Sequence, residues 1–383
     1  MSGIVIMISP REKKSYDVVI VGAGVQGLSS AVFLAKNGIK SVAVVEKEGF
    51  YGRGSSSRSG SMIMKSRENK PKIELSLSSF LFFERFKEFF GEDLHFRRTG
   101  FLSLVGEGLA ERYEIEHQTR RELGVPSEKL TTTDIGKLCP AISLEGVEFG
   151  VFCRDDGEVS AEQILGNYYK YAKKLGVDFF FDNEVEHFDT TCGKLTGLKS
   201  SEFQFECNYV VNAAGAGAPK VAALLAIDLP QSNLRRSIFF CRVEKPQLYA
   251  GPMVEDAELE WYYRGLVDGR VLIGMGLEPD SEITDGPNMD FLPEIRAATN
   301  LRAPALKSFE VIGGHSGIRP LSPDIVPIIG PSGKYPNFIS NSGWGGEGIM
   351  HSPAGGAIVS DLIDGSQNYQ FDIGAFNPKR FDN

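Results

Sequence analysis

The stretch Asp17-Val-Val-Ile-Val-Gly-Ala-Gly-Val-Gln-Gly27 decides the fold of this chain. It begins with a short apolar run, which is typical of a parallel strand that is buried on both faces. A Gly-x-Gly-x-x-Gly turn follows at once, and apolar residues then recur at helical spacing as far as Gly38. The next apolar run, Ser41-Val-Ala-Val-Val45, ends at Glu46. This order of strand, glycine turn, helix and strand predicts a βαβ unit.

The glycine turn and the start of the helix predict a dinucleotide site. Gly22 allows the tight turn, Gly24 lets the backbone approach a pyrophosphate, and Gly27 lets the helix pack close to the strand. The helix begins at Val25 and Gln26, where free N–H groups and the positive end of the helix dipole favour phosphate.

An acidic residue completes this motif. Glu46 can accept hydrogen bonds from the ribose hydroxyls of adenosine and would repel a 2′-phosphate, so NADP is disfavoured. We include its neighbour Lys47 among the expected cofactor contacts. The position of the motif near the N-terminus and the later Gly-rich segments favour FAD over NAD, because a flavin dinucleotide is long and needs several loops along its length.

Segments typical of a dinucleotide-binding fold alternate with strand-rich segments along the chain. Residues 52–62 have the composition of a loop, whereas residues 230–311 are rich in β signals. The predicted fold class is α/β, with a Rossmann-type FAD-binding domain interleaved with an α+β substrate domain built on an antiparallel sheet. The expected FAD-binding domain comprises residues 1–80, 147–225 and 312–383, and the expected substrate domain comprises residues 81–146 and 226–311.

A helix rich in phenylalanine is expected after the loop at 52–62. Its aromatic residues are Phe80, Phe82, Phe83, Phe86, Phe89 and Phe90. We interpret them as core or as an interdomain face. If the chain were instead an electron-transfer or assembly subunit with no substrate of its own, Phe82, Phe86 and Phe90 could form a partner face.

The C-terminal part contains a Gly- and Pro-rich turn around Arg319, then a glycine-rich loop at residues 341–353 and a helix over about 354–363. The N-terminus of that helix would point at the loop and favour negative charge there, as on a reduced flavin. A guanidinium at Arg319 can bind a substrate carboxylate through two parallel hydrogen bonds. A structural ion pair, for example with Asp324, is the alternative.

Six segments in this order make the chain resemble the D-amino acid oxidase superfamily of FAD-dependent enzymes, which includes glycine oxidase, sarcosine oxidases, and D-amino acid and proline dehydrogenases. They are Asp17–Glu46, residues 54–63, Asp156-Gly-Glu-Val-Ser160, Val210-Val-Asn-Ala-Ala-Gly-Ala-Gly217, Gly317-Ile-Arg-Pro-Leu-Ser-Pro-Asp324 and Gly343–Pro353. The resemblance covers nearly the whole chain, and the order of the segments is more specific than any one motif.

The resemblance implies roles for particular residues. Ser56, Ser57 and Arg58 would line the pyrophosphate and ring region, Val185 would contact adenine through its backbone, and Ala213, Ala214 and Gly215 would lie along the cofactor. Gly345, Gly346, Gly348 and Ile349 would cap the pyrimidine end. Arg319 would bind the substrate carboxylate beside the flavin. Trp344 would belong to the same loop, and Tyr262 and Tyr263 would lie on a strand near the flavin, where either could reach substrate or simply pack.

The chain also departs from the pattern of this superfamily. Monomeric sarcosine oxidases place a carboxylate-binding lysine where Met350 stands and an oxygen-activating lysine near Leu272. Their absence favours a dehydrogenase with an unknown electron acceptor over a fast oxidase. The loop at residues 54–63 contains no His or Cys, so noncovalent FAD is expected.

The implied reaction is oxidation of a small carboxylated amine of the D-amino acid, glycine, sarcosine or proline type. Hydride transfer to flavin N5 would give an imine, which water hydrolyses. A 2-hydroxy acid or glycerol-3-phosphate-type dehydrogenase is an alternative. Alcohol oxidation needs a base, so that alternative would require His315 or His351. For both histidines a structural role is the other interpretation.

Composition excludes several other classes. With 41 Lys and Arg against 50 Asp and Glu, the net charge is −9, and no basic stripe stands out, so a nucleic-acid partner is not expected. The 5 cysteines are scattered without a C-x-x-C pair, which argues against a metal site. No apolar run reaches 18 residues, so no transmembrane helix is expected. We expect a cytoplasmic protein, either a homo-oligomer or a subunit of a hetero-oligomeric dehydrogenase.

Overall fold

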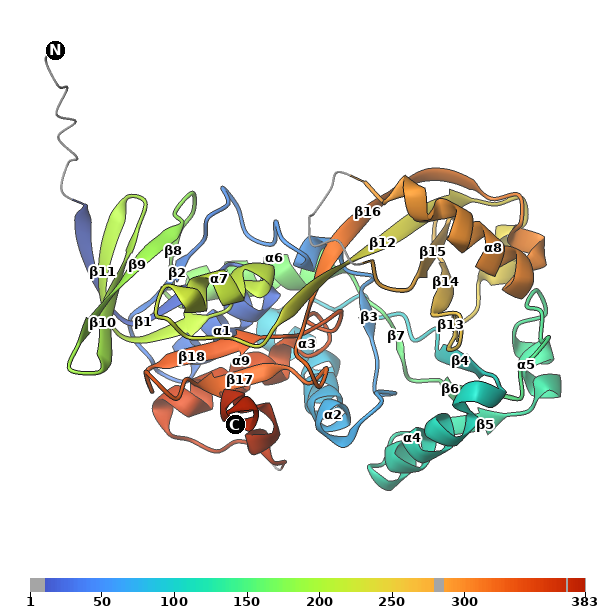
Figure 1. The fold of residues 1–383 in the computed structure, drawn as a ribbon, viewed down its shortest axis with the longest axis horizontal. Helices are drawn as coiled ribbons and strands as arrows, with labels where there is room; N and C mark the ends of the chain where they lie inside the picture. The colour runs from blue at the N-terminus through green and yellow to red at the C-terminus, as the bar shows by residue number, and fades with distance from the viewer. Residues whose placement is uncertain (1–10, 279–285, 370, 383) are drawn as a thin grey trace, which may run out of the picture.

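The computed structural model describes residues 11–278, 286–369 and 371–382, and shows two large sheets with helices packed around them (Figure 1). The first ten residues of the expected FAD-binding domain thus lie outside the described part. The helices are α1 (Val25–Lys36), α2 (Lys70–Glu84), α3 (Phe86–Phe90), α4 (Ala110–Glu122), α5 (Thr132–Leu138), α6 (Ala161–Lys174), α7 (Ala218–Ala223), α8 (Leu292–Arg302) and α9 (Ser352–Asp364).

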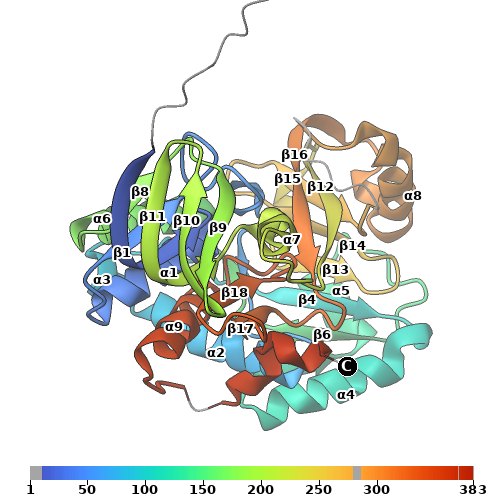
Figure 2. The ribbon, with the colours of Figure 1, turned by 60° about the vertical axis from the view of Figure 1, so that its left-hand side comes forward.

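The first sheet contains the predicted βαβ unit. Its strands are β1 (Glu12–Val21), β2 (Val42–Val45), β8 (Asp178–Phe180), β9 (Val185–Thr191), β10 (Lys194–Ser200), β11 (Phe203–Asn212), β17 (Ile328–Pro331) and β18 (Phe338–Ser342). They follow the order β17-β18-β11-β1-β2-β8. In addition, β10 pairs with β11, and β9 pairs with β10. Figure 2 shows β1, β11, β10 and β9 side by side. Parallel pairing of β1 with both β2 and β11 places the glycine turn at the carboxyl edge of the sheet.

Alternate side chains of β1 are buried on opposite faces of this sheet. Val18 and Ile20 belong to one core with residues of α1, α6 and α9, while Val19 and Val21 belong to another with residues of β10, β11 and α7. Burial on both faces explains the uninterrupted apolar run at residues 18–21, which sequence analysis interpreted as a parallel strand.

The second sheet is largely antiparallel, as predicted for the second domain. Its strands are β4 (Phe101–Val105), β5 (Ser127–Leu130), β6 (Phe149–Cys153), β12 (Ser232–Arg242), β13 (Met253–Asp256), β14 (Trp261–Gly265), β15 (Val271–Met275) and β16 (Glu310–Leu321). They follow the order β16-β12-β15-β14-β13-β4-β6-β5. Two short strands, β3 (Met62–Ile63) and β7 (Gly157–Glu158), pair with each other. This arrangement confirms the predicted fold class.

Two strands that the expected boundaries assign mainly to the FAD-binding domain belong to the second sheet. β6, expected within residues 147–225 of the FAD-binding domain, pairs with β4 and β5 in the second sheet. β16, expected mostly within residues 312–383, pairs along its length with β12. The physical reason is that strand partners are chosen by long-range pairing, which local composition does not encode.

The two faces of the second sheet differ. Trp261, Tyr263 and Ile273 point to one face and form a core with residues of α5 and α8. Ile238, Tyr262 and Leu272 point to the other face and form a small separate cluster. Because side chains alternate along a strand, the second face is the one that carries the residues near the first domain.

The phenylalanine-rich segment forms α2 and α3 and confirms the interpretation as core. Phe82 and Phe86 are only 9% and 1% exposed, and the ring of Phe82 stacks on that of Phe89 at 4.5 Å. Phe90 packs against Tyr168 of α6. Phe82 and Phe86 are therefore not available as a partner face. In the part of the chain that the structure describes, no helix has the length and apolar character needed to cross a membrane.

Candidate cofactor and active site

The glycine turn after β1 makes two backbone contacts that a side chain would prevent. Gly22 has φ +105°, and a β-carbon there would lie 2.6 Å from the carbonyl oxygen of Ala213. A β-carbon on Gly27 would lie 1.9 Å from the carbonyl oxygen of Gly22. At Gly24, by contrast, a β-carbon would meet only Ser56 Oγ, at 3.4 Å. The turn is thus closely packed underneath and bare on the side that faces Ser56.

Glu46 holds the turn from the end of β2. Its Oε2 accepts a hydrogen bond from the Ala23 N–H at 2.6 Å, and its Oε1 accepts one from the Glu48 N–H at 3.0 Å. A carboxylate has about four lone-pair positions, so both oxygens can still accept from ribose hydroxyls. The Val25 N–H donates to Ser56 Oγ at 3.1 Å, which joins the first turn of α1 to the loop at residues 52–62.

A cavity of about 640 Å³ begins at this turn and continues to β12 and β16 of the second sheet. Most of the residues predicted to bind cofactor or substrate line it, namely Gly22, Gly24, Val25, Gln26, Glu46, Lys47, Ser56, Arg58, Val185, Ala213, Ala214, Gly215, Arg319, Trp344, Gly345, Gly346, Gly348 and Ile349. Gly27, Ser57, Tyr262, Tyr263 and His351 are not among its lining residues. For Gly27 the reason is its packing role under the turn.

The shape of the cavity wall fits FAD. Backbone and very small side chains form the wall at Gly24, at residues 213–215, and at the glycines 345, 346 and 348, so a long flat ligand can approach the main chain at several points. The acidic Glu46 lies at one end and Arg319 at the other. Among the described lining residues there is no His, Cys or Tyr.

Arg319 lies on β16, and its guanidinium packs directly on the glycine-rich loop. A β-carbon on Gly346 would lie 2.4 Å from Arg319 Cζ, so the absence of a side chain at Gly346 makes room for the guanidinium. Burial, with the nearby charge of Arg236 as a second cause, lowers the pKa of Arg319 to about 9. Among the described residues Arg319 forms no ion pair with a carboxylate.

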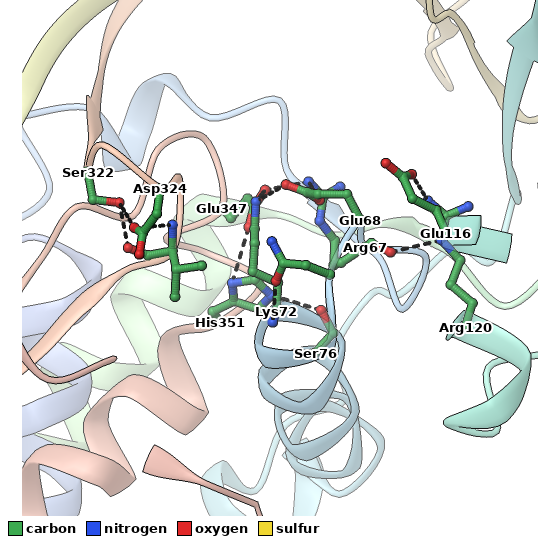
Figure 3. A network of polar contacts seen from close by, with 12 residues as sticks. Arg67, Glu68, Lys72, Ser76, Glu116, Arg120, Ser322, Asp324, Glu347 and His351 are labelled. Carbon is green, nitrogen blue, oxygen red and sulfur yellow. Dashed lines mark hydrogen bonds and ion pairs between the residues drawn. The ribbon is translucent and has the colours of Figure 1, made fainter. Parts of the chain in front are cut away.

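The structural alternative for Arg319 was an ion pair with Asp324. Asp324 instead pairs with Arg380, whose Nε and Nη2 lie 2.8 and 3.0 Å from its two carboxylate oxygens. It also accepts a hydrogen bond from Ser322 Oγ at 3.0 Å (Figure 3). Asp324 therefore binds the C-terminal segment through Arg380, and it is not the partner of Arg319.

Sequence analysis did not identify Arg236, an arginine that lies near Arg319 in this cavity. Arg236 lies on β12, next to β16, and lines the cavity together with Arg319. Its guanidinium lies 4.6 Å from the ring centre of Tyr262. No local motif surrounds Arg236, and only the pairing of β12 with β16 brings it beside Arg319.

The two predicted tyrosines point to opposite faces of β14. Tyr262 lies on the face of Arg236, and its ring lies over Gly274, where a β-carbon would be 2.2 Å from Tyr262 Oη. Tyr263 is 2% exposed and packs against Trp261 and Tyr249 in the core of the second domain. Tyr263 therefore cannot contact a ligand in this cavity, because the two-residue period of the strand turns it away.

His351 is part of a buried polar network behind the glycine-rich loop (Figure 3). It is 0% exposed, its Nε2 lies 2.8 Å from Ser76 Oγ, and its Nδ1 lies 3.5 Å from Glu347 Oε2. Burial, followed by the charges of Arg67 and Lys72, holds its pKa well below 6.5. The predicted catalytic histidine is thus a neutral, buried residue outside the cavity lining.

Glu347 is the centre of this network and lies inside the glycine-rich loop. It pairs with Arg67 and with Lys72 of α2, and Glu68 pairs with the same two cations (Figure 3). Buried charges persist only when they are paired in this way. The network therefore fixes the loop at residues 343–351 against α2. The other predicted base, His315, packs edge-to-face against Phe240, with the ring centres 5.4 Å apart, and does not line the cavity.

A glycine-turn βαβ unit, a long cavity with backbone walls and an antiparallel second sheet define a two-domain flavin-dinucleotide enzyme. The family model for FAD-dependent oxidoreductases, the DAO family, matches residues 17–362. The chain belongs to this family, and its cofactor is FAD.

Comparison with individual proteins agrees with this assignment. The chain is 26% identical over 363 residues to sarcosine oxidase subunit beta of Rhizobium meliloti, covering 92% of this chain and 86% of that protein. The structure of glycine oxidase from Geobacillus kaustophilus matches with a TM-score of 0.83 and 25% identity over 96% of this chain and 99% of that chain. L-proline dehydrogenase from P. horikoshii shares the fold, with a TM-score of 0.87 and 24% identity over 97% of this chain and 99% of that chain.

Proposed function

We propose that this protein oxidises a small carboxylated amine of the D-amino acid, glycine, sarcosine or proline type. The observation that carries the proposal is the guanidinium of Arg319, which lies in the cofactor cavity against Gly346 and forms no ion pair within the described part of the chain. A carboxylate is the natural partner for such a group. The names of the relatives, a sarcosine oxidase subunit and a glycine oxidase, support an amine substrate.

The residues of the chain would hold and orient the substrate. Arg319 would bind the carboxylate through parallel hydrogen bonds and so fix the Cα–H toward the cofactor. Bound FAD supplies a hydride acceptor at N5. The α-amino group must be neutral before oxidation, and water then hydrolyses the imine product to a keto acid or aldehyde and free amine.

The environment of the cavity favours an amine over an alcohol. Alcohol oxidation requires a base that removes the hydroxyl proton. The two histidines considered for that task, His315 and His351, both lie outside the cavity lining. A neutral amine needs no such base, which supports the amine proposal over a hydroxy acid dehydrogenase.

We also propose that the protein is a dehydrogenase with noncovalent FAD. Leu272, near the position of the oxygen-activating lysine in monomeric sarcosine oxidases, is 3% exposed and packs beside Ile238 and Tyr262. The cation opposite it, Arg264, is paired with Glu158 at 3.0 Å. Among the described residues, the cation opposite Leu272 is therefore neutralised, which disfavours rapid reaction with oxygen. The absence of His, Cys and Tyr from the described lining supports noncovalent attachment.

The electron acceptor would be another protein or a small molecule. The likeness to sarcosine oxidase subunit beta supports a role as a subunit of a hetero-oligomeric dehydrogenase, with a homo-oligomer as the alternative.

The deciding experiment is anaerobic mixing of the FAD-loaded protein with a panel of amino acids and N-alkyl amino acids, in both enantiomers. Loss of the flavin absorbance band with a subset of these amines is the expected result. If none of them reduces the flavin while a 2-hydroxy acid does, the proposal of amine oxidation is wrong.

A further inference from the structure

Two guanidinium groups, from neighbouring strands, share the substrate end of the cavity. In the antiparallel pairing of β12 with β16, Arg319 lies opposite Leu234, and Arg236 lies opposite Gly317. Residues directly opposite in an antiparallel pair project to the same face, and so do residues two apart on one strand. Arg319 and Arg236 therefore project from the same face, as diagonal neighbours with β-carbons at about 7–8 Å, a separation that long side chains can bridge.

Within the described residues, the guanidinium of Arg236 has few hydrogen-bond partners. Among the described residues its Nε is buried and has no hydrogen-bond partner. Its Nη2 donates to the carbonyl oxygen of Glu260 at 3.4 Å, near the limit for a hydrogen bond. The preceding residue gives the contrast, because Arg235 points to the opposite face and its Nε donates to Glu278 Oε2 at 3.0 Å. The charge of Arg235 is thus neutralised by a carboxylate, whereas the guanidinium of Arg236 is presented to the cavity.

Glu255 is a buried acidic residue on which the charges of both arginines act. It lies on β13, opposite Tyr262, and so on the same face of the sheet. Burial raises its pKa, which the charges of Arg236, Arg67 and Arg319 oppose. Within the described residues it forms an ion pair with neither Arg236 nor Arg319. Burial is the main cause of the lowered pKa of Arg319, and the charge of Arg236 is the next, which the charge of Glu347 opposes.

We propose that Arg236 binds a second carboxylate of the substrate, so that the preferred substrate is a small amine with two carboxylates. This inference rests on the proposed function, in which Arg319 binds the first carboxylate. A substrate with two carboxylates would satisfy the donors of Arg236 and relieve the repulsion between the two guanidinium groups, whereas a monocarboxylate leaves Arg236 buried beside Tyr262 without an anion. The diagonal placement of the two arginines matches carboxylates separated by a few carbon atoms.

The test uses inert ligands, so it does not depend on turnover. The FAD-loaded protein is titrated with glutarate and with pentanoate, a pair of equal chain length that differs by one carboxylate, and the flavin spectrum reports binding. We expect glutarate to bind at least about tenfold more tightly, since one additional charged hydrogen-bonded pair corresponds to about that factor. Equal dissociation constants for the two ligands in the unaltered protein would overturn the proposal.

Two variants test whether Arg236 is the residue that causes the preference for glutarate. Arg236→Met should bring the dissociation constant of glutarate to within about twofold of that of pentanoate in the same variant. Arg242→Met is the matched control, because Arg242 lies on the same strand but is exposed and pairs with Glu310. It should keep the full preference. If Arg236→Met keeps the preference as well, another group binds the second carboxylate. Should Arg236→Met lose FAD, Arg236→Lys, which retains the charge, should keep part of the preference.

A second set of ligands separates this inference from the proposed function. Anaerobic flavin reduction is compared between aspartate and alanine and between iminodiacetate and sarcosine, with both enantiomers where they exist. Faster reduction by the dicarboxylates supports both amine oxidation and the role of Arg236. Faster reduction by alanine or sarcosine supports amine oxidation and contradicts the role of Arg236. Tight binding of glutarate without reduction by any amine supports the role of Arg236 and contradicts amine oxidation.

Discussion

The guanidinium of Arg319 packs against Gly346 and so joins the two halves of the site. The guanidinium of Arg319, on the second sheet, occupies the space that a side chain at Gly346 would fill, with Cζ only 2.4 Å from the position of a β-carbon. The glycine of the cofactor loop therefore determines where the guanidinium of Arg319 can lie.

Replacement of this glycine should displace the arginine. Gly346→Ala would force Arg319 away from its present position, and we expect kcat/KM to fall roughly tenfold to a hundredfold, since overpacking of this kind costs about 1–3 kcal/mol. Steady-state kinetics with the best amine of the panel measures the effect. Gly251→Ala is the control, because a β-carbon at Gly251 meets nothing within 4 Å. Unchanged kinetics in Gly346→Ala would show that Arg319 can move without loss of function.

Removal of the guanidinium itself should separate substrate binding from cofactor binding. Arg319→Leu keeps an apolar side chain but loses the charged hydrogen bonds to the carboxylate, so we expect KM or the substrate dissociation constant to rise about a hundredfold, for a loss of about 3 kcal/mol. FAD content, measured by flavin absorbance of the purified protein, should be retained. A parallel loss of FAD would mean that Arg319 stabilises the cofactor site.

The buried His351 should make the protein sensitive to acid. Its pKa is well below 6.5 in the folded protein and close to 6.5 when unfolded, so the unfolded state takes up the proton first. The stability that comes from the neutral form is fully present above pH 6.5 and is lost as the pH falls toward the folded pKa, by on the order of 1.4 kcal/mol per pH unit. Thermal unfolding between pH 7.5 and about 5 should therefore show a smaller pH dependence in His351→Gln. Identical pH profiles for the two proteins would contradict this assignment.

The apolar environment of Leu272 should limit the reaction with oxygen. With Leu272 buried and the nearby Arg264 paired with Glu158, we expect the substrate-reduced protein to be reoxidised at least about tenfold more slowly by dissolved oxygen than by an artificial quinone or dye acceptor. Stopped-flow absorbance of the flavin band measures both rates. Comparable rates would identify the protein as an oxidase.

The local part of the fold and site was predictable from sequence, and the long-range part was not. The turn at Gly22, Gly24 and Gly27 could be predicted because the three glycines stand close together in the sequence, directly after an apolar run. Arg319 could be singled out because it lies in a recognisable Gly- and Pro-containing motif, although the structure shows a strand, β16, where sequence analysis expected a turn. By contrast, the place of Arg236 beside Arg319 depends on the pairing of two strands that are far apart in the sequence.

The same reason explains the error at Tyr263. Sequence analysis placed both Tyr262 and Tyr263 near the flavin, but only one of two consecutive residues in a strand can face it. Which of the two does so is set by the register with β13 and β15, and register is not visible in a five-residue strand. Sequence analysis could not assign β6 and β16 to the second sheet for the same reason, because the pairing of strands is not visible in the local sequence.

The alternation of side chains along β12 has a consequence for how such a protein can diversify. Arg236 and Ile238 face the cavity, whereas Arg235 and Phe239 contribute to the folded framework on the opposite face. Substitutions at every second position can therefore change the lining of the cavity while the framework stays intact. Selection for a new substrate can act on one face of the sheet at little cost to stability.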